Sequence, residues 1–317
     1  MRVHHSNLCS EITLATNDER TAVCCLSSVN LEYYDEWKKV PAFIPDLIRM
    51  LDNVLESFIQ SAPPQLERAQ FSAMRERSLG LGAMGFHAYL QKNGISFESP
   101  MASAINYEMF SSIKSQAQKT TEQLAVERGA CPDDDSCSVR NAHLLAVAPN
   151  ASSSIICGNT SPSIEPFRAN AYTQKTKSGS YLQKNKFLEE LLEKYESNDD
   201  NTWKSIVTNK GSVQHLEFLS EEEKEVFKTA VEINQSWVIE HAAQRQEFIC
   251  QSQSVNLFFP PDVNKGELHN IHMLAWAKNM KTLYYLRSEA ISRADNVPNK
   301  IKREIIFEQQ DCLSCEG

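Results

Sequence analysis

The stretch Arg20-Thr-Ala-Val-Cys-Cys-Leu-Ser-Ser-Val-Asn-Leu31 is short, largely apolar and rich in β-branched residues, so it predicts a strand. Residues 46–60 place apolar side chains at helical spacing, and Pro63 and Pro64 end that pattern. Further helices are expected over residues 103–128, 185–196, 220–248 and 265–279, and further strands over residues 143–148, 250–258 and 282–286. Because short strands alternate with helices, the sequence predicts an α/β fold with a parallel sheet covered by helices.

The composition is typical of a globular chain. With 317 residues, 41% of them hydrophobic, the chain can bury a sizeable core. Its net charge of −9 argues against a protein that coats nucleic acid, because binding to phosphate backbones needs surplus cations. No apolar run approaches the roughly 18 residues of a membrane span, and the N-terminus has no signal-peptide core. We therefore expect a soluble, cytoplasmic protein with no nucleic-acid and no membrane partner.

The chain has nine cysteines. Because this number is odd and the chain has no secretion signal, a disulfide framework is not expected. Cys157 and Cys250 are expected to be small buried apolar residues. The pairs Cys131/Cys137 and Cys312/Cys315 have no neighbouring His-x-x-x-His to complete a zinc site, so no metal site is expected.

Two segments contain motifs that are compatible with phosphate binding. Gly80-Leu-Gly82-Ala-Met-Gly85 fits G-x-G-x-x-G, but no hydrophobic strand precedes it, so close packing at a helix start is favoured over dinucleotide binding. Pro149-Asn-Ala-Ser-Ser-Ser154 follows a predicted strand and suggests a helix start or tight turn. Such a turn could hold a phosphate or carboxylate with its free N–H groups, and the alternative is an ordinary polar turn.

The most informative segment is Ser6-Asn-Leu-Cys-Ser-Glu-Ile12. If this loop is extended, its amide (Asn7), thiol (Cys9) and carboxylate (Glu11) all point the same way. Together they offer a hydrogen-bond donor, a nucleophilic or one-electron sulfur and a general base. Cys24 could add a second thiol. A cysteine hydrolase is the competing interpretation, but no local histidine supplies its base.

Two features near the C-terminus do not by themselves establish a role in electron transfer. Tyr284 and Tyr285 lie in a predicted strand, where adjacent residues face opposite sides. From about Ser288 the chain turns polar, and residues 291–317 are expected to be a mobile tail beyond a folded body of residues 1–290.

These segments resemble the active-site region of the large, catalytic subunit of class I ribonucleotide reductase. The matching segments occur in the family's order, and agreement at six of them is not expected by chance. They are residues 6–12, 22–28, 77–82, 148–154, 164–166 and 281–285, followed by the cysteine pair at 312 and 315.

The resemblance implies a role for each residue in the active site. Cys9 matches the thiyl-radical cysteine that abstracts the substrate 3′-hydrogen, Glu11 the carboxylate that takes the 3′-hydroxyl proton, and Asn7 the amide that binds the substrate. Cys24 matches one of two thiols that reduce the 2′-position and form a redox-active disulfide. Tyr284 matches the first of two stacked tyrosines that relay the radical.

The remaining matches concern the substrate and the partners. The turn formed by Asn150, Ala151, Ser152, Ser153 and Ser154 matches the loop that grips the substrate diphosphate, and Tyr285 matches the second relay tyrosine. Cys312 and Cys315 match tail thiols that re-reduce the active site and are recharged by thioredoxin or glutaredoxin. The resemblance implies no cofactor on this chain, because the radical comes from a small subunit with a di-metal or tyrosyl-radical centre. The implied activity reduces ribonucleoside diphosphates and serves deoxyribonucleotide biosynthesis for DNA replication.

The chain departs from the family in length, because the family's large subunit is more than twice as long. The missing N-terminal portion would carry the second reducing cysteine, the nucleotide-effector sites and the first half of a ten-stranded α/β barrel. This chain would hold the second half of that barrel, the central finger loop near residues 5–12 and the flexible tail. Beginning at Met1, it is expected to be a naturally split or truncated large subunit that needs its N-terminal half. The alternative is a non-catalytic remnant that binds the small subunit or the missing half.

Overall fold

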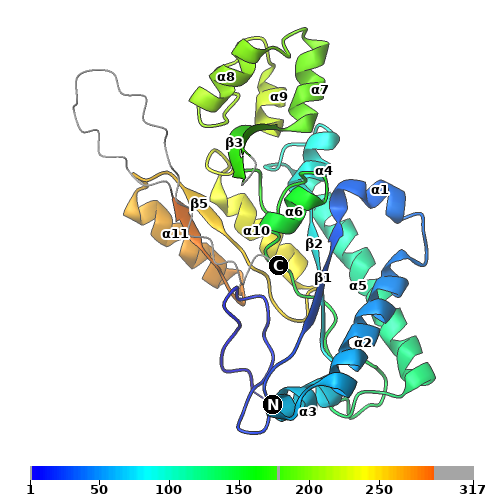
Figure 1. The fold of residues 1–317 in the computed structure, drawn as a ribbon. Coiled ribbons are helices and arrows are strands. Elements are labelled where there is room, and N and C mark those ends of the chain that lie inside the picture. Colours follow the sequence, from blue (N-terminus) through cyan, green and yellow to red (C-terminus); the bar gives the residue numbers. More distant parts are fainter. Residues whose placement is uncertain (1, 177–178, 289–317) are drawn as a thin grey trace.

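The computed structural model describes residues 2–176 and 179–288, and Figure 1 shows their arrangement. The predicted tail, residues 291–317 with Cys312 and Cys315, lies outside the described residues. Among the described residues, no helix is both long and apolar enough to cross a membrane.

Parallel strands run through the middle of the molecule. Strand β1 (Cys25–Asn30) pairs in parallel with β2 (Leu79–Met84). Strand β5 (Leu257–Phe259) pairs in parallel with β6 (Leu286–Ser288). The strand expected over residues 20–31 therefore begins only at Cys25.

Extended segments between these pairs complete the parallel array. Leu81 of β2 forms a parallel bridge with Leu145, and Val147 forms another with Gln253. The strand predicted over residues 143–148 thus lies beside β2 as bridges rather than as a continuous ladder. Of the strand predicted over residues 250–258, only the end belongs to β5. The resulting order, β1, β2, residues 143–148, residues 251–259 and β6, forms the expected half of an α/β barrel.

Gly80 and Gly82 lie in strand β2, which was not predicted, whereas Gly85 is the N-cap residue of α4, so close packing at a helix start is confirmed for Gly85 alone. A Cβ atom on Gly80 would lie 2.4 Å from Leu26 Cδ2 and 2.9 Å from Cys24 Sγ. A Cβ atom on Gly82 would lie 2.6 Å from the backbone oxygen of Ala146. The glycines therefore let β2 approach both of its neighbours, a need that no local hydrophobic pattern reveals.

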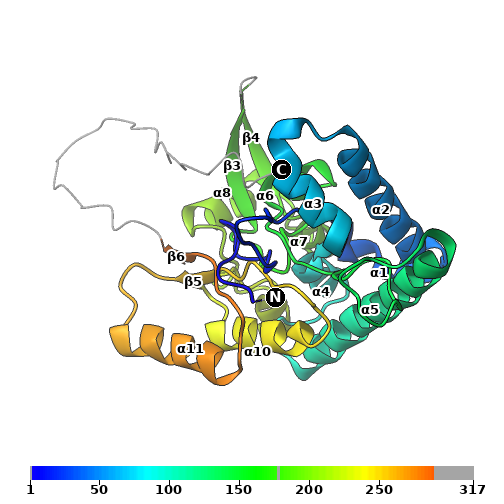
Figure 2. The same ribbon diagram turned by 90° about the horizontal axis from the view of Figure 1, so that it is seen from below.

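Helices cover the outer face of these strands, as Figures 1 and 2 show. The predicted helices at 46–60, 103–128, 185–196 and 265–279 are confirmed with shifted ends. The helices are α1 (Tyr34–Trp37), α2 (Phe43–Ser61), α3 (Glu67–Glu76), α4 (Phe86–Lys92), α5 (Pro100–Arg128), α6 (Ala151–Ile156), α7 (Lys186–Lys194), α8 (Asp200–Thr208), α9 (Glu221–Val226), α10 (Gln235–Gln246) and α11 (Lys265–Ala277), with 3-10 turns η1 (Leu31–Tyr33) and η2 (Pro64–Leu66).

The single helix predicted over residues 220–248 is instead two helices, α9 and α10. The expected capping box is present, since the Ser220 hydroxyl accepts from Glu223 N at 3.2 Å and the Glu223 carboxylate accepts from Ser220 N. The chain leaves the helix after Val226, and Asn234 caps a new one by accepting from Ser236 N. The apolar periodicity of residues 220–248 does not reveal this second N-cap.

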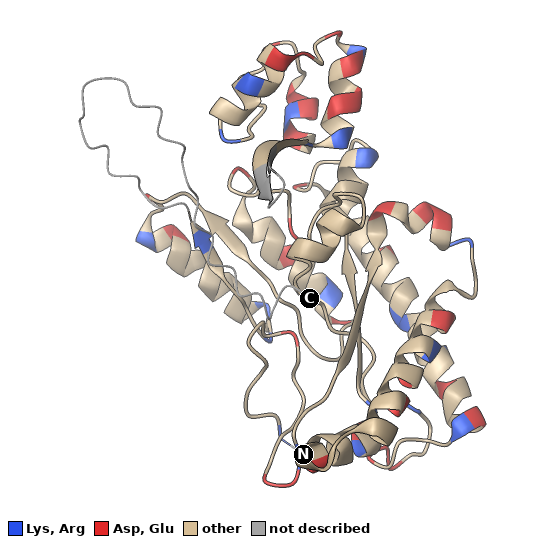
Figure 3. Cartoon of the chain, viewed as in Figure 1, with Lys and Arg blue, Asp and Glu red and all other residues tan. Residues whose placement is uncertain are grey.

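A second, smaller core lies beyond the strands. The hairpin of β3 (Ala171–Thr176) and β4 (Gly179–Lys184) leads into α7, α8 and α9, which appear together at the top of Figure 1. Trp203, Leu188 and Ile206 are buried in this core. The charged residues gather on the helices, whereas β1 and β2 carry none (Figure 3).

The buried carboxylate of Asp52 links helices α2 and α5 to the start of strand β2. Asp52 of α2 is fully buried and accepts from Arg77 Nη2 at 2.9 Å, Arg128 Nη1 at 2.9 Å and Asn141 Nδ2 at 3.1 Å. Burial alone would raise the pKa of Asp52, but Arg77 and Arg140 hold it below its usual value. The cluster joins α2, the start of β2, the end of α5 and the segment before residues 143–148.

Candidate active site

The N-terminal loop folds back on itself instead of running extended. Asn7 O accepts from Ser10 N at 3.2 Å, Asn7 Oδ1 accepts from Ile12 N at 3.0 Å, and Ser10 has a left-handed φ of 66°. Cys9 and Glu11 are consequently buried while Asn7 remains exposed. The expectation that all three side chains point the same way was wrong, because the turn at Ser10 breaks the alternation.

The thiol of Cys9 meets the tyrosine pair. Cys9 is 4% exposed, and its Sγ donates to Tyr284 Oη at 3.3 Å, across 275 residues of sequence. The Tyr284 and Tyr285 rings stack with centroids 3.9 Å apart and planes 30° apart. The prediction that they face opposite sides was wrong, since both precede β6 rather than lying within a strand. Cys9, Tyr284 and Tyr285 thus form a continuous contact path.

The environment keeps Tyr284 neutral. Burial, followed by the hydrogen bond with Cys9, raises the pKa of Tyr284 far above its usual value. The neutral phenol can therefore lose an electron readily only if its proton leaves at the same time. Tyr285 is 42% exposed, and the guanidinium of Arg287 lies 5.0 Å from its ring centroid. The path thus runs from the buried thiol to the molecular surface.

Backbone contacts fix the tyrosine pair in place. Tyr284 N donates to Val255 O at 2.8 Å, and Tyr285 N donates to the amide oxygen of Asn256 at 3.0 Å. The Asn256 side chain also donates to Glu165 at 2.5 Å, and burial raises the pKa of Glu165. Lys281 Nζ donates to three successive carbonyls, those of residues 249–251, at 2.6–3.1 Å. The tyrosine segment is therefore clamped to the strand beside it.

Glu11 lies on the same side as Cys9. The hydroxyl of Ser254 is shared between Cys9 O at 2.5 Å and Glu11 Oε2 at 3.0 Å. Glu11 O also accepts from Ser252 N at 2.9 Å. Ser254 thereby holds the carboxylate and the thiol-bearing backbone together within one buried cluster.

Cys24 lies just before β1 and is partly buried. Gln251 Nε2 donates to Cys24 Sγ at 3.2 Å. Burial raises the pKa of Cys24 to about 12, against the opposing effect of the Gln251 hydrogen bond. Cys24 is therefore a protonated thiol at neutral pH. Cys25 is partly buried and packs against the main core.

The predicted turn at Asn150 begins the short helix α6. Ser154 N donates to Asn150 O at 3.0 Å. With its amide turned to satisfy its surroundings, Asn150 donates to Ala83 O at 3.2 Å and Ala148 O at 3.1 Å, and exchanges a hydrogen bond with Ser28 Oγ. The turn is thus fastened to β1 and to the carboxyl end of β2, the edge where ligands bind in α/β folds.

The other cysteines differ in exposure. Cys250 was expected to be buried and is partly buried against the core, where its sulfur accepts from Leu144 N at 3.1 Å and Leu145 N at 3.2 Å. Cys157 is exposed, so the expectation of a buried residue was wrong. It follows the end of α6, where the helix leaves its packed surface.

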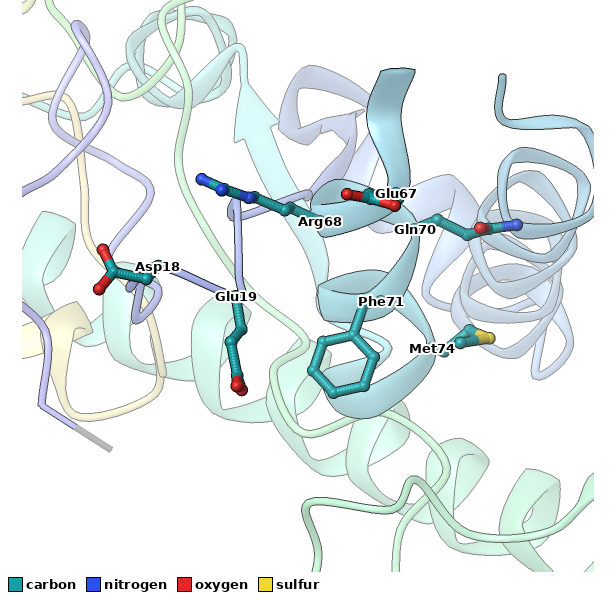
Figure 4. Close-up of a pocket in the computed structure, with 7 residues that line it drawn as sticks. All are labelled: Asp18, Glu19, Glu67, Arg68, Gln70, Phe71 and Met74. Carbon is teal, nitrogen blue, oxygen red and sulfur yellow. The ribbon is translucent and has the colours of Figure 1, made fainter. Parts of the chain in front are cut away.

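A surface groove of about 650 Å³ lies apart from these residues (Figure 4). It runs between the turn before Arg20 and helix α3, and it contains none of the predicted site residues. Its lining residues are Asp18, Glu19, Glu67, Arg68, Gln70, Phe71 and Met74.

The side chains that hold the candidate site residues in place were not predicted from the sequence. Gln251, Ser254 and Asn256 lie in one extended segment, and each touches a predicted site residue or its neighbour. Five of the six residues in Gln251-Ser-Gln-Ser-Val-Asn256 are polar, a signal in the sequence that the prediction of a strand over residues 250–258 did not use. Lys281 lay inside a quoted motif without a role.

Comparison with known proteins gives a consistent result. Residues 1–138 and 135–286 match the family model of the ribonucleotide reductase barrel domain. The ribonucleoside-diphosphate reductase large subunit of Invertebrate iridescent virus 6 is 54% identical over 295 residues, which are 91% of this chain and 31% of that protein. Its counterpart in Invertebrate iridescent virus 3 is 47% identical, over 100% of this chain and 51% of that protein.

A solved structure agrees with the sequence relatives. The class Id ribonucleotide reductase alpha subunit of Actinobacillus ureae superposes with a TM-score of 0.86 at 42% identity, covering 92% of this chain and 54% of that one. The chain thus spans between about a third and just over half of the length of these relatives. Since the family model matches residues 1–286 and the half-barrel carries the contact path from Cys9 to the tyrosine pair, the chain belongs to the ribonucleotide reductase barrel-domain family.

Proposed function

We propose that this chain is the C-terminal part of the large subunit of a class I ribonucleoside-diphosphate reductase and is active when assembled with an N-terminal half. The observation that carries the proposal is the path from Tyr285 through Tyr284 to the buried thiol of Cys9, with a ring separation of 3.9 Å and a thiol–phenol distance of 3.3 Å. A hydrolase would not need such a path, and a remnant would not need to keep it.

Radical transfer along this path moves one hydrogen atom at each step. A phenoxyl radical on Tyr284 takes the hydrogen of the Cys9 thiol, which leaves a neutral phenol and a thiyl radical. The raised pKa of Tyr284 supports this route, because a phenol that stays neutral exchanges its proton and electron together. The radical itself is expected from a small subunit with a di-metal or tyrosyl-radical centre, and this chain is proposed to bind no cofactor.

Substrate reduction is proposed to use the groups around Cys9. The thiyl radical abstracts the 3′-hydrogen of the ribonucleotide, Glu11 accepts the 3′-hydroxyl proton, and the 2′-hydroxyl takes a proton from a thiol of the reducing pair and leaves as water. After the 2′-position is reduced, Cys9 returns its hydrogen to the 3′-carbon and Glu11 returns its proton. Asn7 is proposed to hydrogen-bond the substrate, and its exposure supports that role. The burial of Glu11 beside Ser254 supports its role, because a carboxylate shielded from water interacts strongly with a nearby hydroxyl.

Two further groups complete the proposed reaction. Cys24 supplies one of the two thiols that form a disulfide as the 2′-position is reduced, and the other is expected on the N-terminal half. Cys312 and Cys315, which lie outside the described residues, are proposed to reduce that disulfide and to be recharged by thioredoxin or glutaredoxin. The diphosphate is proposed to lie on the turn of residues 150–154, on backbone N–H groups other than that of Ser154, which donates to Asn150 O.

Conversion of CDP to dCDP tests the proposal. The chain is assayed with a class I small subunit and dithiothreitol, alone and mixed with the N-terminal part of a longer relative. We expect turnover only in the mixture and none with Cys9→Ser. A stable complex without turnover would support the alternative, a remnant that only binds its partners. Turnover by the chain alone would contradict the need for a second cysteine from the partner.

A further inference from the structure

The side chain of Gln251 connects the surroundings of two predicted redox residues, Cys9 and Cys24. It is fully buried and makes three hydrogen bonds, which use both N–H groups and one lone pair of the oxygen. Its Oε1 accepts from Thr13 N at 3.3 Å, and its Nε2 donates to Leu79 O at 3.0 Å and to Cys24 Sγ at 3.2 Å. Thr13 belongs to the segment that carries Cys9 and Glu11, so one amide bridges the finger loop, β2 and the thiol of Cys24.

The backbone determines which way this amide faces. Thr13 offers an N–H group, which can only donate, and Leu79 offers a carbonyl, which can only accept. The oxygen of Gln251 must therefore face Thr13 and its nitrogen must face Leu79. Because Cys24 lies on the nitrogen side, its sulfur is always an acceptor of an N–H group and its own hydrogen points elsewhere.

We propose that Gln251 is a positioning residue for Cys24, one that holds the sulfur as a hydrogen-bond acceptor, favours its thiolate and ties it to the loop bearing Cys9. A donor aimed at the sulfur stabilises a thiolate more than a thiol, because hydrogen bonds to charged acceptors are stronger. The same donor fits a disulfide sulfur, which is also only an acceptor. That Cys24 is the reducing thiol rests on the proposed function, whereas the effect of Gln251 on its chemistry does not.

The rest of the environment opposes ionisation of Cys24. Burial raises its pKa most, and Cys25, Cys250 and Glu11 raise it further. Gln251 acts in the opposite direction. Gly80 lies against another side of the Cys24 sulfur, since an added Cβ atom there would lie 2.9 Å from it. The amide is thus the group that makes deprotonation of this thiol accessible.

Alkylation of Cys24 in the full-length chain tests this role directly. All variants carry Cys25→Ala so that the adjacent thiol does not interfere, and the modified peptide is measured by mass spectrometry. At pH 9, below the pKa of Cys24, the rate follows the fraction of thiolate, so one pKa unit changes it tenfold. We expect Gln251→Met, which keeps the size and removes the donor, to slow alkylation roughly tenfold. Gln251→Glu, which turns a carboxylate oxygen toward the sulfur, is expected to slow it further.

Two controls separate thiolate stability from altered packing. Gln253→Met removes an equally buried amide two residues away, whose partners are Arg245 and Ala242 rather than Cys24, and is expected to leave the rate within about twofold. Iodoacetamide and the bulkier N-ethylmaleimide are compared, because a change in access affects the larger reagent more, whereas a lower thiolate fraction slows both equally.

The outcomes are distinct. Unchanged or faster alkylation in both Gln251 variants overturns the proposal, as does slowing confined to the larger reagent. Failure of both variants to fold, while Gln253→Met folds, would make Gln251 a purely structural residue and would also overturn it. Absence of CDP reduction by the assembled wild-type chain would contradict the proposed function without altering this result.

Discussion

Replacing Gly82 by alanine tests how closely β2 must approach the segment that leads into the turn at Asn150. The added Cβ would lie 2.6 Å from Ala146 O, 3.2 Å from Val147 Cα and 3.3 Å from Ser28 Oγ. Two of these atoms belong to the backbone, so no side-chain rotation relieves the contact. The strands must separate by several tenths of an ångström.

The energetic cost follows from the contacts that such a separation strains. Overpacking in a well-packed interior typically costs about 1–3 kcal/mol. The movement also weakens the hydrogen bonds from Leu81 N to Leu144 O, at 2.8 Å, and from Ala146 N to Leu81 O, at 3.3 Å. We therefore expect Gly82→Ala to lower the unfolding free energy by about 3 kcal/mol, which corresponds to a Tm lowered by about 5–10 °C.

Urea and thermal unfolding followed by circular dichroism measure this loss. Gly94→Ala is the matched control, because its Cβ meets no heavy atom within 4 Å and its φ of 65° leaves only backbone strain, about 1 kcal/mol. If Gly82→Ala loses no more stability than Gly94→Ala, the reasoning from close strand approach is refuted.

Three further perturbations have definite expected outcomes. Asp52→Asn should lower the unfolding free energy by about 3 kcal/mol at pH 7, because it leaves the buried Arg77 and the largely buried Arg140 with only the partly exposed Glu56 as an ionic partner among the described residues. Since the folded-state pKa of Asp52 is lowered, urea titrations of wild type and variant should converge as pH falls below about 4. Tyr284→Phe should keep the ring stack and the Tm within a few degrees but abolish dCDP formation in the assembled enzyme, and residual turnover near wild type would contradict the radical path through Cys9. Lys281→Met should remove three hydrogen bonds to carbonyls and lower the unfolding free energy by about 2 kcal/mol in chemical denaturation, with an unchanged midpoint counting against the clamp.

Much of the helical fold was predictable because it depends on local pattern. The apolar stripe that predicted a helix over residues 46–60 is the buried face of α2, which includes Ile48, Leu51 and Leu55. Strand β2 was missed for the opposite reason. Its glycines at 80 and 82 carry no hydrophobic signal and acquire meaning only from Leu26 and Ala146, which are distant in sequence.

The candidate site divides in the same way. Resemblance to a known family pointed to Cys9, Glu11 and a stacked tyrosine pair, and the stacking is confirmed, but the resemblance did not place the pair against Cys9. Ring stacking of Tyr284 on Tyr285 required the chain to leave strand alternation, which their residue types do not encode. The contact between Gln251 and Cys24 spans 227 residues, so no local spacing could have announced it.

Strand β1 has a consequence for how stability itself should be measured. Among the described strands it pairs only with β2, and Leu26 on it is 43% exposed. An N-terminal half that adds a strand to this edge would bind only the folded chain, so its binding free energy would add to the folding free energy. Apparent stability would then rise with partner concentration, by about 2.7 kcal/mol at a hundred times the Kd. Melting temperatures of this chain are therefore best compared at stated concentrations of both halves.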